Sequence, residues 1–188
     1  MRTRQSAAYK GIVALLIKEG SKDFIGGDPI LLTTYAHMAI DIHHIFPAAY
    51  CQKQGYEPDK WKSIINKAPL TAPTNRAIGG DAPSKYLATI ESTRNIATSR
   101  LNEIVETHAV SAGLLRADDF EWFIQDRASR LLDLIEQAMG KRITGRDSDE
   151  VKDKFGDALI DRKSTRLNSV TSLSRMPSSA CKKKTTNN

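Results

Sequence analysis

The chain has 188 residues, which is enough for one ordinary domain with a buried core and too few for two large domains. Its formal charge of +6 and pI near 9.3 would normally suggest a nucleic-acid or anionic-membrane partner. However, seven of the 28 basic residues and one of the 22 acidic residues lie in residues 161–188, which leaves 21 of each in residues 1–160. The net charge of the chain is therefore no evidence for DNA binding.

The basic C-terminal tail resembles translated adapter DNA from a sequencing library. The stretch from Asp161 to Ser169 matches one end of such an adapter, residues 174–180 resemble its distal end, and Lys182 to Lys184 resemble translated adenines. A native basic tail is the alternative reading. We exclude residues 161–188 from the fold prediction, as a segment of foreign origin.

Cysteine content and hydropathy give limits on compartment. Cys181 lies in the tail, so Cys51 remains alone, without a disulfide framework or a Cys-x-x-Cys zinc knuckle. The sequence has no run of about 18 apolar residues and no signal-peptide core near Met1. We therefore expect a reduced, cytoplasmic protein with no membrane partner.

The first two elements flank a Gly-Gly-Asp-Pro turn. Residues 6–19 carry apolar side chains at helical spacing and stop at Gly20, which predicts a helix. Residues 30–45 mix β-branched and aromatic side chains and end before Pro47, so we expect the distal part to form a short strand that leads into His43 and His44. A polar loop through Gly55 and Pro58 should follow.

Residues 63–74 are expected to form a second strand or an extended arm, because Pro69 and Pro73 forbid a regular helix across them. A helix should then start at Ser84, and it either continues to Val105 or breaks and restarts.

The final helix is the clearest. Asp118 stands three residues before Glu121, which predicts a capping box at the helix start, and Gly140 should end the helix. An apolar stripe at helical spacing predicts that this helix packs against the module formed by the preceding elements or against another domain. The stripe consists of Phe120, Phe123, Ile124, Leu131, Leu134, Ile135 and Ala138. Order should fade between Lys141 and Asp161.

The chemistry-bearing residues gather around the segment Asp41 to Pro47, which reads DIHHIFP, and the segment Asn66 to Asn75, which reads NKAPLTAPTN. Hydrolysis of a phosphodiester needs a base for the attacking water and a cation for the developing charge. One histidine and one metal ion can supply both. Taken alone, His43 and His44 would be one packed and one exposed histidine without metal, because adjacent strand residues point to opposite faces.

These motifs resemble the HNH, or His-Me finger, nuclease family, in which a metal ligand precedes a catalytic His and a Pro follows three residues later. The resemblance implies a ββα-metal core with His44 as general base and Asn66 as the residue that orients the base region. It implies His43 and Asn75 as ligands of one divalent ion, Mg²⁺ or Mn²⁺. The family usually has Asp where this chain has His43, a softer ligand that favours Mn²⁺ or a similar ion. Asp41, two residues earlier, would support His43 from behind.

The residues around these motifs resemble one particular group of nucleases. His43 to Pro47, Asn66 to Leu70, residues 74–80 and residues 83–87 resemble the C-terminal nuclease half of GmrSD-type restriction proteins, which cut foreign DNA carrying modified bases. The large N-terminal half of those proteins, a ParB-like nucleotide-hydrolysing domain, has no counterpart here. This implies a fragment of a longer antiviral defence protein.

Local charge adds a candidate DNA contact. Residues 53–100 carry eight bases against four acids, and we expect Arg76 and Lys85 to contact phosphates, although such charges are usually a solvated face. Residues 103–157 carry thirteen acids against eight bases and should face away from DNA. We expect His37 and His108 to be structural.

Together these features predict an α+β protein that is mostly helical. We expect an N-terminal helix in residues 1–29, at the end of a truncated upstream region, an HNH nuclease core in 30–106, a C-terminal helical part in 107–145 and poor order in 146–188. The predicted activity is divalent-metal-dependent DNA cleavage. A non-catalytic nucleic-acid-binding or interaction module with the same fold, a helical domain with incidental histidines, and RNA as substrate all stay open.

Overall fold

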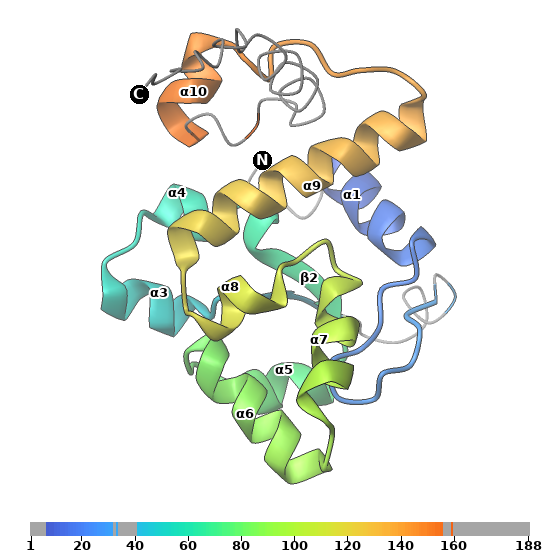
Figure 1. The fold of residues 1–188 in the computed structure, drawn as a ribbon, viewed down its shortest axis with the longest axis vertical. Coiled ribbons are helices and arrows are strands. Elements are labelled where there is room, and N and C mark those ends of the chain that lie inside the picture. Colours follow the sequence, from blue (N-terminus) through green and yellow to red (C-terminus); the bar gives the residue numbers. More distant parts are fainter. Residues whose placement is uncertain (1–6, 32, 34–40, 156–158, 160–188) are drawn as a thin grey trace, which may run out of the picture.

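A small antiparallel sheet lies among helices in the computed structural model, which describes residues 7–31, 33, 41–155 and 159 (Figure 1). The elements before the sheet's second strand are α1 Ala7–Lys18, β1 Asp41–His44, α3 Ala48–Gln54, α4 Pro58–Trp61 and the 3-10 turn η1 Ile64–Asn66. The following elements are β2 Lys67–Leu70, α5 Ala72–Ile78, α6 Pro83–Arg94, α7 Thr98–Glu106, α8 Ala112–Arg116, α9 Phe120–Met139 and α10 Asp149–Phe155. The predicted class, α+β and mostly helical, is confirmed.

The sheet consists of β1 and β2, with His43 opposite Ala68 and His44 opposite Lys67. The predicted strand leading into the two histidines is therefore confirmed. The extended segment expected over residues 63–74 is shorter than predicted, because η1 precedes β2 and α5 begins at Ala72. Pro73 stands in the first turn of α5, where the missing N–H of proline leaves no intrahelical bond unmade.

The polar loop expected through Gly55 and Pro58 is confirmed only for residues 55–57, because helices α3 and α4 form on either side of it. Gly55 ends α3 with φ of 74°, a left-handed conformation that glycine adopts without strain. Pro58 opens α4, and Trp61 anchors that helix in the core. Glycine and proline therefore act here as helix boundaries, although both also favour loops.

Two helix boundaries needed the structure. The apolar pattern after Ser84 breaks and restarts, because Asn95 adopts φ of 51° between α6 and α7. The predicted capping box at Asp118 is wrong: the carboxylate of Asp119 accepts from the Trp122 N–H at the start of α9. Asp118 instead accepts from the N–H of Ser84, at 2.8 Å, and from its hydroxyl, at 2.6 Å, so it caps α6.

Helix α9 joins two apolar clusters, and in Figure 1 it runs between α10 and the rest of the molecule. Its N-terminal half, with Phe120, Phe123 and Ile124, packs in the cluster that also holds the buried residues of the sheet and of α6 and α7. Its Leu131 packs with the buried face of α1. Gly140 ends α9 in a left-handed conformation, as predicted. The expected packing of the α9 stripe is confirmed for Phe120 to Ile135, whereas Ala138 at its end is exposed.

The predicted domain boundaries can be compared with the contacts in the structure. Contacts cross the expected boundaries at residues 29 and 106, since Ser21 and Lys22 hydrogen-bond to Thr107. Within the segment 146–188, residues 149–155 form α10, while residues 160–188 lie outside the described part. Among the described helices, none combines the length and apolar character needed to cross a membrane.

Candidate nuclease site

The two histidines at the end of β1 have different surroundings. His43 is buried, and His44 is half-buried with its ring 5.7 Å from the Trp61 ring in an edge-on arrangement. In an antiparallel pair, side chains of directly opposed residues share a face, so His43 neighbours Ala68 and His44 neighbours Lys67. The adjacent histidines therefore present two faces of one strand end, as split roles would require.

Asn66 fixes the backbone that follows the histidines. Its side chain is fully buried, and its Oδ1 accepts from the Phe46 N–H at 2.8 Å. Its Nδ2 donates to the Phe46 carbonyl at 2.9 Å and to the Trp61 carbonyl at 3.0 Å. The Asn66 carbonyl also accepts from the N–H of Ile45. One side chain thus ties the residues after His44 to the residue whose ring contacts His44.

Arg127 of α9 secures the turn that carries Asn66, a role that the sequence did not reveal. This arginine is fully buried, and its Nη1 donates to the carbonyls of Ile64 and Ile65 in η1. Its Nε donates to the carbonyl of His108 at 3.2 Å. Burial lowers the pKa of Arg127 to about 9, so the side chain remains charged at neutral pH. A buried guanidinium therefore positions the turn through backbone carbonyls alone, among the bonds described.

Asn75 lies in α5, which starts two residues after the end of β2. Its side chain is half-buried. Thr71 caps the helix, since its hydroxyl accepts from the Thr74 N–H at 3.4 Å. The Asn75 N–H donates to the Thr71 carbonyl at 2.9 Å, which closes the first turn. The predicted ligand His43 and base His44 therefore lie in β1, Asn66 lies just before β2, and the second predicted ligand Asn75 lies in α5.

Asp23, in the loop after α1, is a second residue that the sequence did not reveal. Its Oδ1 accepts from the Thr71 N–H at 3.0 Å, and its Oδ2 accepts from the Thr74 hydroxyl at 2.6 Å. Oδ2 also accepts from the N–H groups of Ile25 and Gly26. Burial alone would raise the pKa of Asp23, but these hydrogen bonds outweigh it and lower the pKa below its usual value. The Asp23 carboxylate is therefore ionised and joins the N-terminal segment to α5.

Lys67 adds a buried positive charge on the His44 face of the sheet. It is 8% exposed, and its Nζ lies 5.6 Å from the centre of the Tyr9 ring of α1. A lysine over an aromatic face is stabilised by the ring's quadrupole. Helix α1 therefore contributes directly to the environment of the strand end.

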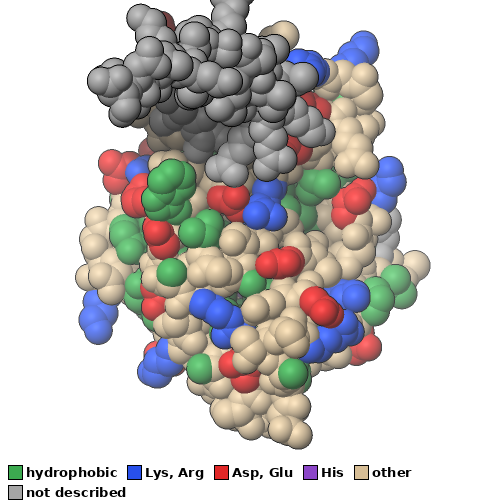
Figure 2. Space-filling model, viewed as in Figure 1, with side chains coloured by type: hydrophobic (Ala, Val, Ile, Leu, Met, Phe, Trp, Pro, Cys, Tyr) green, Lys and Arg blue, Asp and Glu red, His purple; other side chains and the backbone are tan. Residues whose placement is uncertain are grey.

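The predicted phosphate contacts lie on exposed surfaces. Arg76 is exposed on α5, and Lys85 is exposed on α6, where its Nζ lies 2.7 Å from Asp81. On the face drawn in Figure 2, basic and acidic side chains are interspersed over the described helices, not separated into fields of one sign. The role of Arg76 and Lys85 in DNA binding stays a prediction.

Three further residues were considered from the sequence: Asp41, His37 and His108. The backbone of Asp41 pairs with Leu70 in the sheet, but its side chain and all of His37 lie outside the described residues. His108 is fully buried, and its Nε2 lies 2.7 Å from the Lys22 carbonyl. Burial lowers the pKa of His108 to about 4. His108 is a neutral core histidine, in agreement with its predicted structural role.

His43 and Asn75 are the ligands that the resemblance assigns to a divalent ion, and the Nε2 atom of His43 is buried in this conformation. His43 offers an imidazole nitrogen and Asn75 an amide oxygen, a mixed set that Mn²⁺ and, less readily, Mg²⁺ accept. Within residues 7–31, 33, 41–155 and 159, no cluster of three or more His, Cys, Asp or Glu side chains could hold a metal ion. A site with one histidine and one asparagine would not form such a cluster.

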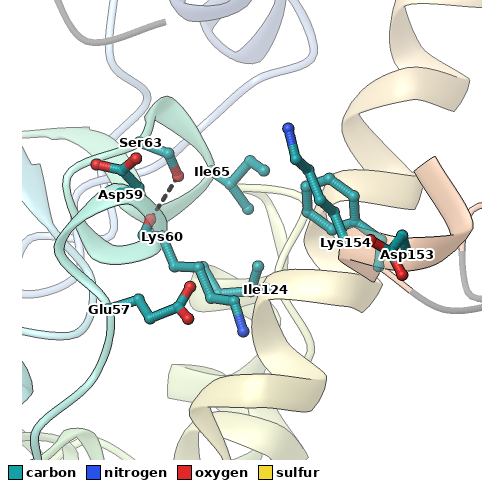
Figure 3. Close-up of a pocket in the computed structure, with 9 residues that line it drawn as sticks. Glu57, Asp59, Lys60, Ser63, Ile65, Ile124, Asp153 and Lys154 are labelled. Atoms are coloured by element: carbon teal, nitrogen blue, oxygen red, sulfur yellow. Dashed lines mark hydrogen bonds between the residues drawn. The ribbon is translucent and has the colours of Figure 1, made fainter. Parts of the chain in front are cut away.

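Two cavities lie beside the site segments, and neither is lined by His43, His44, Asn66 or Asn75. One, of about 410 Å³, is bounded by α4, α9 and α10, and it contains Ser63 and Ile65 next to Asn66 (Figure 3). Figure 3 shows acidic and basic side chains on both sides of it, with the Ser63 hydroxyl bonded to the Lys60 carbonyl. The other, of about 350 Å³, lies between α3 and the start of α6, beside Lys53 and Lys85. Their mixed charge favours no particular ligand.

Comparison with known proteins gives a distant relative and no family. The chain is 28% identical over 118 residues to an uncharacterized protein, MJ0686, of Methanocaldococcus jannaschii. The match covers 59% of this chain but only 20% of the archaeal protein, so the chain spans a small part of that relative's length. No family model matches the chain, and no solved structure matches it. The chain is therefore similar to one segment of a much longer archaeal protein.

Proposed function

We propose that this protein is a divalent-metal-dependent DNA endonuclease with an HNH core in residues 30–106, the cutting module of a restriction protein. The observation that carries the proposal is the Asn66 side chain, which holds both backbone groups of Phe46, two residues after His44. A buried asparagine in this role is what the resemblance to the HNH family implies for Asn66. The order β1, β2, α5 supports the same reading, because a ββα-metal core is built from two strands followed by a helix.

His43 and Asn75 would hold the ion. A bound Mg²⁺ or Mn²⁺ supplies positive charge that stabilises the negative charge developing on the phosphate and the leaving oxygen. The His43 ring comes from the last residues of β1 and the Asn75 amide from the first turns of α5, so the two ligands belong to separate elements. Their position depends on contacts that hold the strand end and the helix, which come from Asn66 and Asp23.

His44 acts as the general base. It accepts a proton from the attacking water on its unprotonated ring nitrogen, which requires a neutral imidazole at the working pH. The edge of the Trp61 ring restricts the imidazole, which is half-buried as a whole and has its Nε2 atom buried in this conformation. Asn66 does not react; it fixes the backbone after His44 and so the orientation of the base. Arg76 and Lys85 contact phosphates of the bound strand, and Lys85 exchanges its ion pair with Asp81 for a phosphate.

The biological setting is part of the proposal. The chain resembles the nuclease half of GmrSD-type proteins, so we propose that a ParB-like nucleotide-hydrolysing domain selects DNA, including DNA with modified bases, and that this module cuts it. The small share of the archaeal relative that the chain matches is consistent with a module of a longer protein.

The test is nicking of supercoiled plasmid by the full chain with Mg²⁺ or Mn²⁺, and with chelator. We expect nicking that requires metal and that falls about a hundredfold or more in His44→Ala, since a general base typically contributes 10² to 10⁴ in rate. The matched control is His108→Gln, which alters a buried histidine outside the site and should nick like the wild type.

The other readings give different results. Undiminished nicking by His44→Ala would refute the assignment of the base. DNA affinity that is equal in the wild type and in His44→Ala, without cutting in either, would indicate a non-catalytic binding module. A parallel assay with structured RNA decides the substrate.

A further inference from the structure

We propose that Asp23 is a positioning residue for the metal site: through Thr71 and Thr74 it fixes the first turn of α5 and thereby holds Asn75 in place. The inference rests on the proposed function, because it assigns a role toward the ion that Asn75 would bind. Asp23 lies outside the core segment that the sequence motifs mark, in the loop after α1.

The Asp23 carboxylate is buried and accepts hydrogen bonds from two separate segments. Asp23 is 6% exposed and receives donors from two segments about 50 residues apart in sequence: Ile25 and Gly26 in its own loop, Thr71 and Thr74 at the start of α5. The Thr71 hydroxyl in turn donates to the Thr74 hydroxyl at 3.2 Å. A buried carboxylate with four donors is fixed by them, and it fixes them in return.

This contact controls Asn75 because α5 is short. The helix has seven residues, and an isolated helix of that length is not stable in water. Thr74 immediately precedes Asn75, and the Asn75 N–H donates to the Thr71 carbonyl, so the two residues bound by Asp23 define the turn from which the Asn75 side chain leaves. A carboxylate near the helix start also interacts favourably with the helix dipole. Release of Asp23 would therefore loosen the ligand without removing it.

The same geometry shows that Asp23 acts through other residues. Oδ1 accepts from the N-cap residue Thr71, and Oδ2 accepts three donors, one of them the Thr74 hydroxyl of α5, so the carboxylate is already engaged by the protein and acts on Asn75 through Thr71 and Thr74. A second carboxylate also accepts hydrogen bonds at the start of a helix. Asp118 caps α6 through the N–H and hydroxyl of Ser84, and α6 carries no predicted metal ligand. Asp118 is the matched control.

The experiment measures the dissociation constant for Mn²⁺ by titration, and amide hydrogen exchange of residues 75–78, in full-length variants. Thr74→Val removes the hydroxyl with little change of shape, Thr74→Ser keeps it, and Asp23→Asn replaces two acceptor sites with a donor. We expect Thr74→Val and Asp23→Asn to weaken Mn²⁺ binding by about tenfold to a hundredfold, the usual effect of a lost partner behind a ligand. Both should also accelerate exchange in α5. Thr74→Ser and Asp118→Asn should bind Mn²⁺ as the wild type does.

A double-variant cycle tests the route of the effect. In an Asn75→Ala background, Thr74→Val should weaken Mn²⁺ binding no further, because the two changes act through the same ligand. Additive losses would overturn the inference.

The remaining outcomes are also decisive. Wild-type Mn²⁺ affinity in Thr74→Val, with faster exchange in α5, would make Asp23 a purely structural residue while leaving the nuclease proposal intact. Unchanged exchange would overturn the role of Asp23 in holding α5. Absence of Mn²⁺ binding and nicking in the wild type would reject the proposed function itself, and this inference with it.

Discussion

Two arginines attach the two halves of α9 to neighbouring segments, in opposite electrostatic settings. Arg127, at the site end, is fully buried and donates to three backbone carbonyls. Arg146, in the loop before α10, is 8% exposed and pairs with Asp133 at 2.8 Å and Glu136 at 3.3 Å. Burial lowers the pKa of Arg127 to about 9. For Arg146, burial also acts to lower the pKa, but the two carboxylates outweigh it and raise the pKa.

The difference shows which attachment constrains the molecule more. A guanidinium that bonds only to carbonyls requires those carbonyls at fixed positions, because no mobile counter-charge can follow it. A guanidinium paired with side chains on one helix tolerates rearrangement, since Asp133 is largely exposed. Arg127 therefore fixes the position of η1 relative to α9, whereas Arg146 holds the loop before α10 with more freedom to rearrange.

The largest expected effect comes from Arg127→Met, which keeps the apolar volume and removes every donor. Three carbonyls, two of them in η1 next to Asn66, lose their partner. We expect the free energy of unfolding to fall by about 3 kcal/mol, with relief from the buried charge offsetting part of the loss. Urea unfolding at pH 7 measures this, and metal-dependent nicking should fall as well. A loss below about 0.5 kcal/mol would contradict the role assigned to Arg127.

The second effect concerns pH at His108, whose carbonyl binds Arg127. Burial is the main cause that lowers its pKa, to about 4 from an unfolded value of 6.5. The unfolded state therefore binds the proton first as pH falls, so stability is full above about pH 6.5 and declines toward pH 4. The loss at pH 4 should approach about 3 kcal/mol, given 1.36 kcal/mol for each pKa unit.

Urea unfolding at a series of pH values checks this expectation, with His108→Gln as control. Glutamine can donate to the Lys22 carbonyl but does not titrate, so its stability should decline less over the same range. An identical decline in both proteins would assign the acid sensitivity to other groups.

The smallest effect is expected for Arg146→Met. Its bonds reach Asp133, Ser129 and the Leu159 carbonyl, and one carboxylate is largely exposed, so solvent replaces part of what is lost. We expect a loss of about 1 kcal/mol in urea unfolding and unchanged nicking. If Arg146→Met equals Arg127→Met in both measurements, the contrast between the two arginines does not hold.

Local patterns predicted the elements that local physics determines. The strand ending at His44 follows from β-branched residues stopped by Pro47, and α9 follows from its apolar stripe and Gly140. Asn66 was found only through the family resemblance, yet its buried contacts with Phe46 suit the predicted role.

What the sequence could not reveal depends on residues far apart along the chain. The Asp23 contact with Thr74 spans 51 residues, and that of Arg127 with Ile64 spans 63. A lone Asp after a helix, or a lone Arg on one, looks the same in sequence whether it is solvated or buried. Asp118 was misassigned for the same reason: its partner, Ser84, lies 34 residues earlier, and only the folded chain brings them together.

The reactivity of Cys51 can report the rate of local opening around α3. Its thiol is buried in α3, the helix that starts four residues after His44, and burial raises its pKa to about 12, so a thiol reagent reaches it only when α3 leaves the core. With Cys181 replaced by serine, Cys51 is the single cysteine in the sequence. The labelling rate then reports how often the segment after the histidines opens, on the time scale of local unfolding, without any substrate.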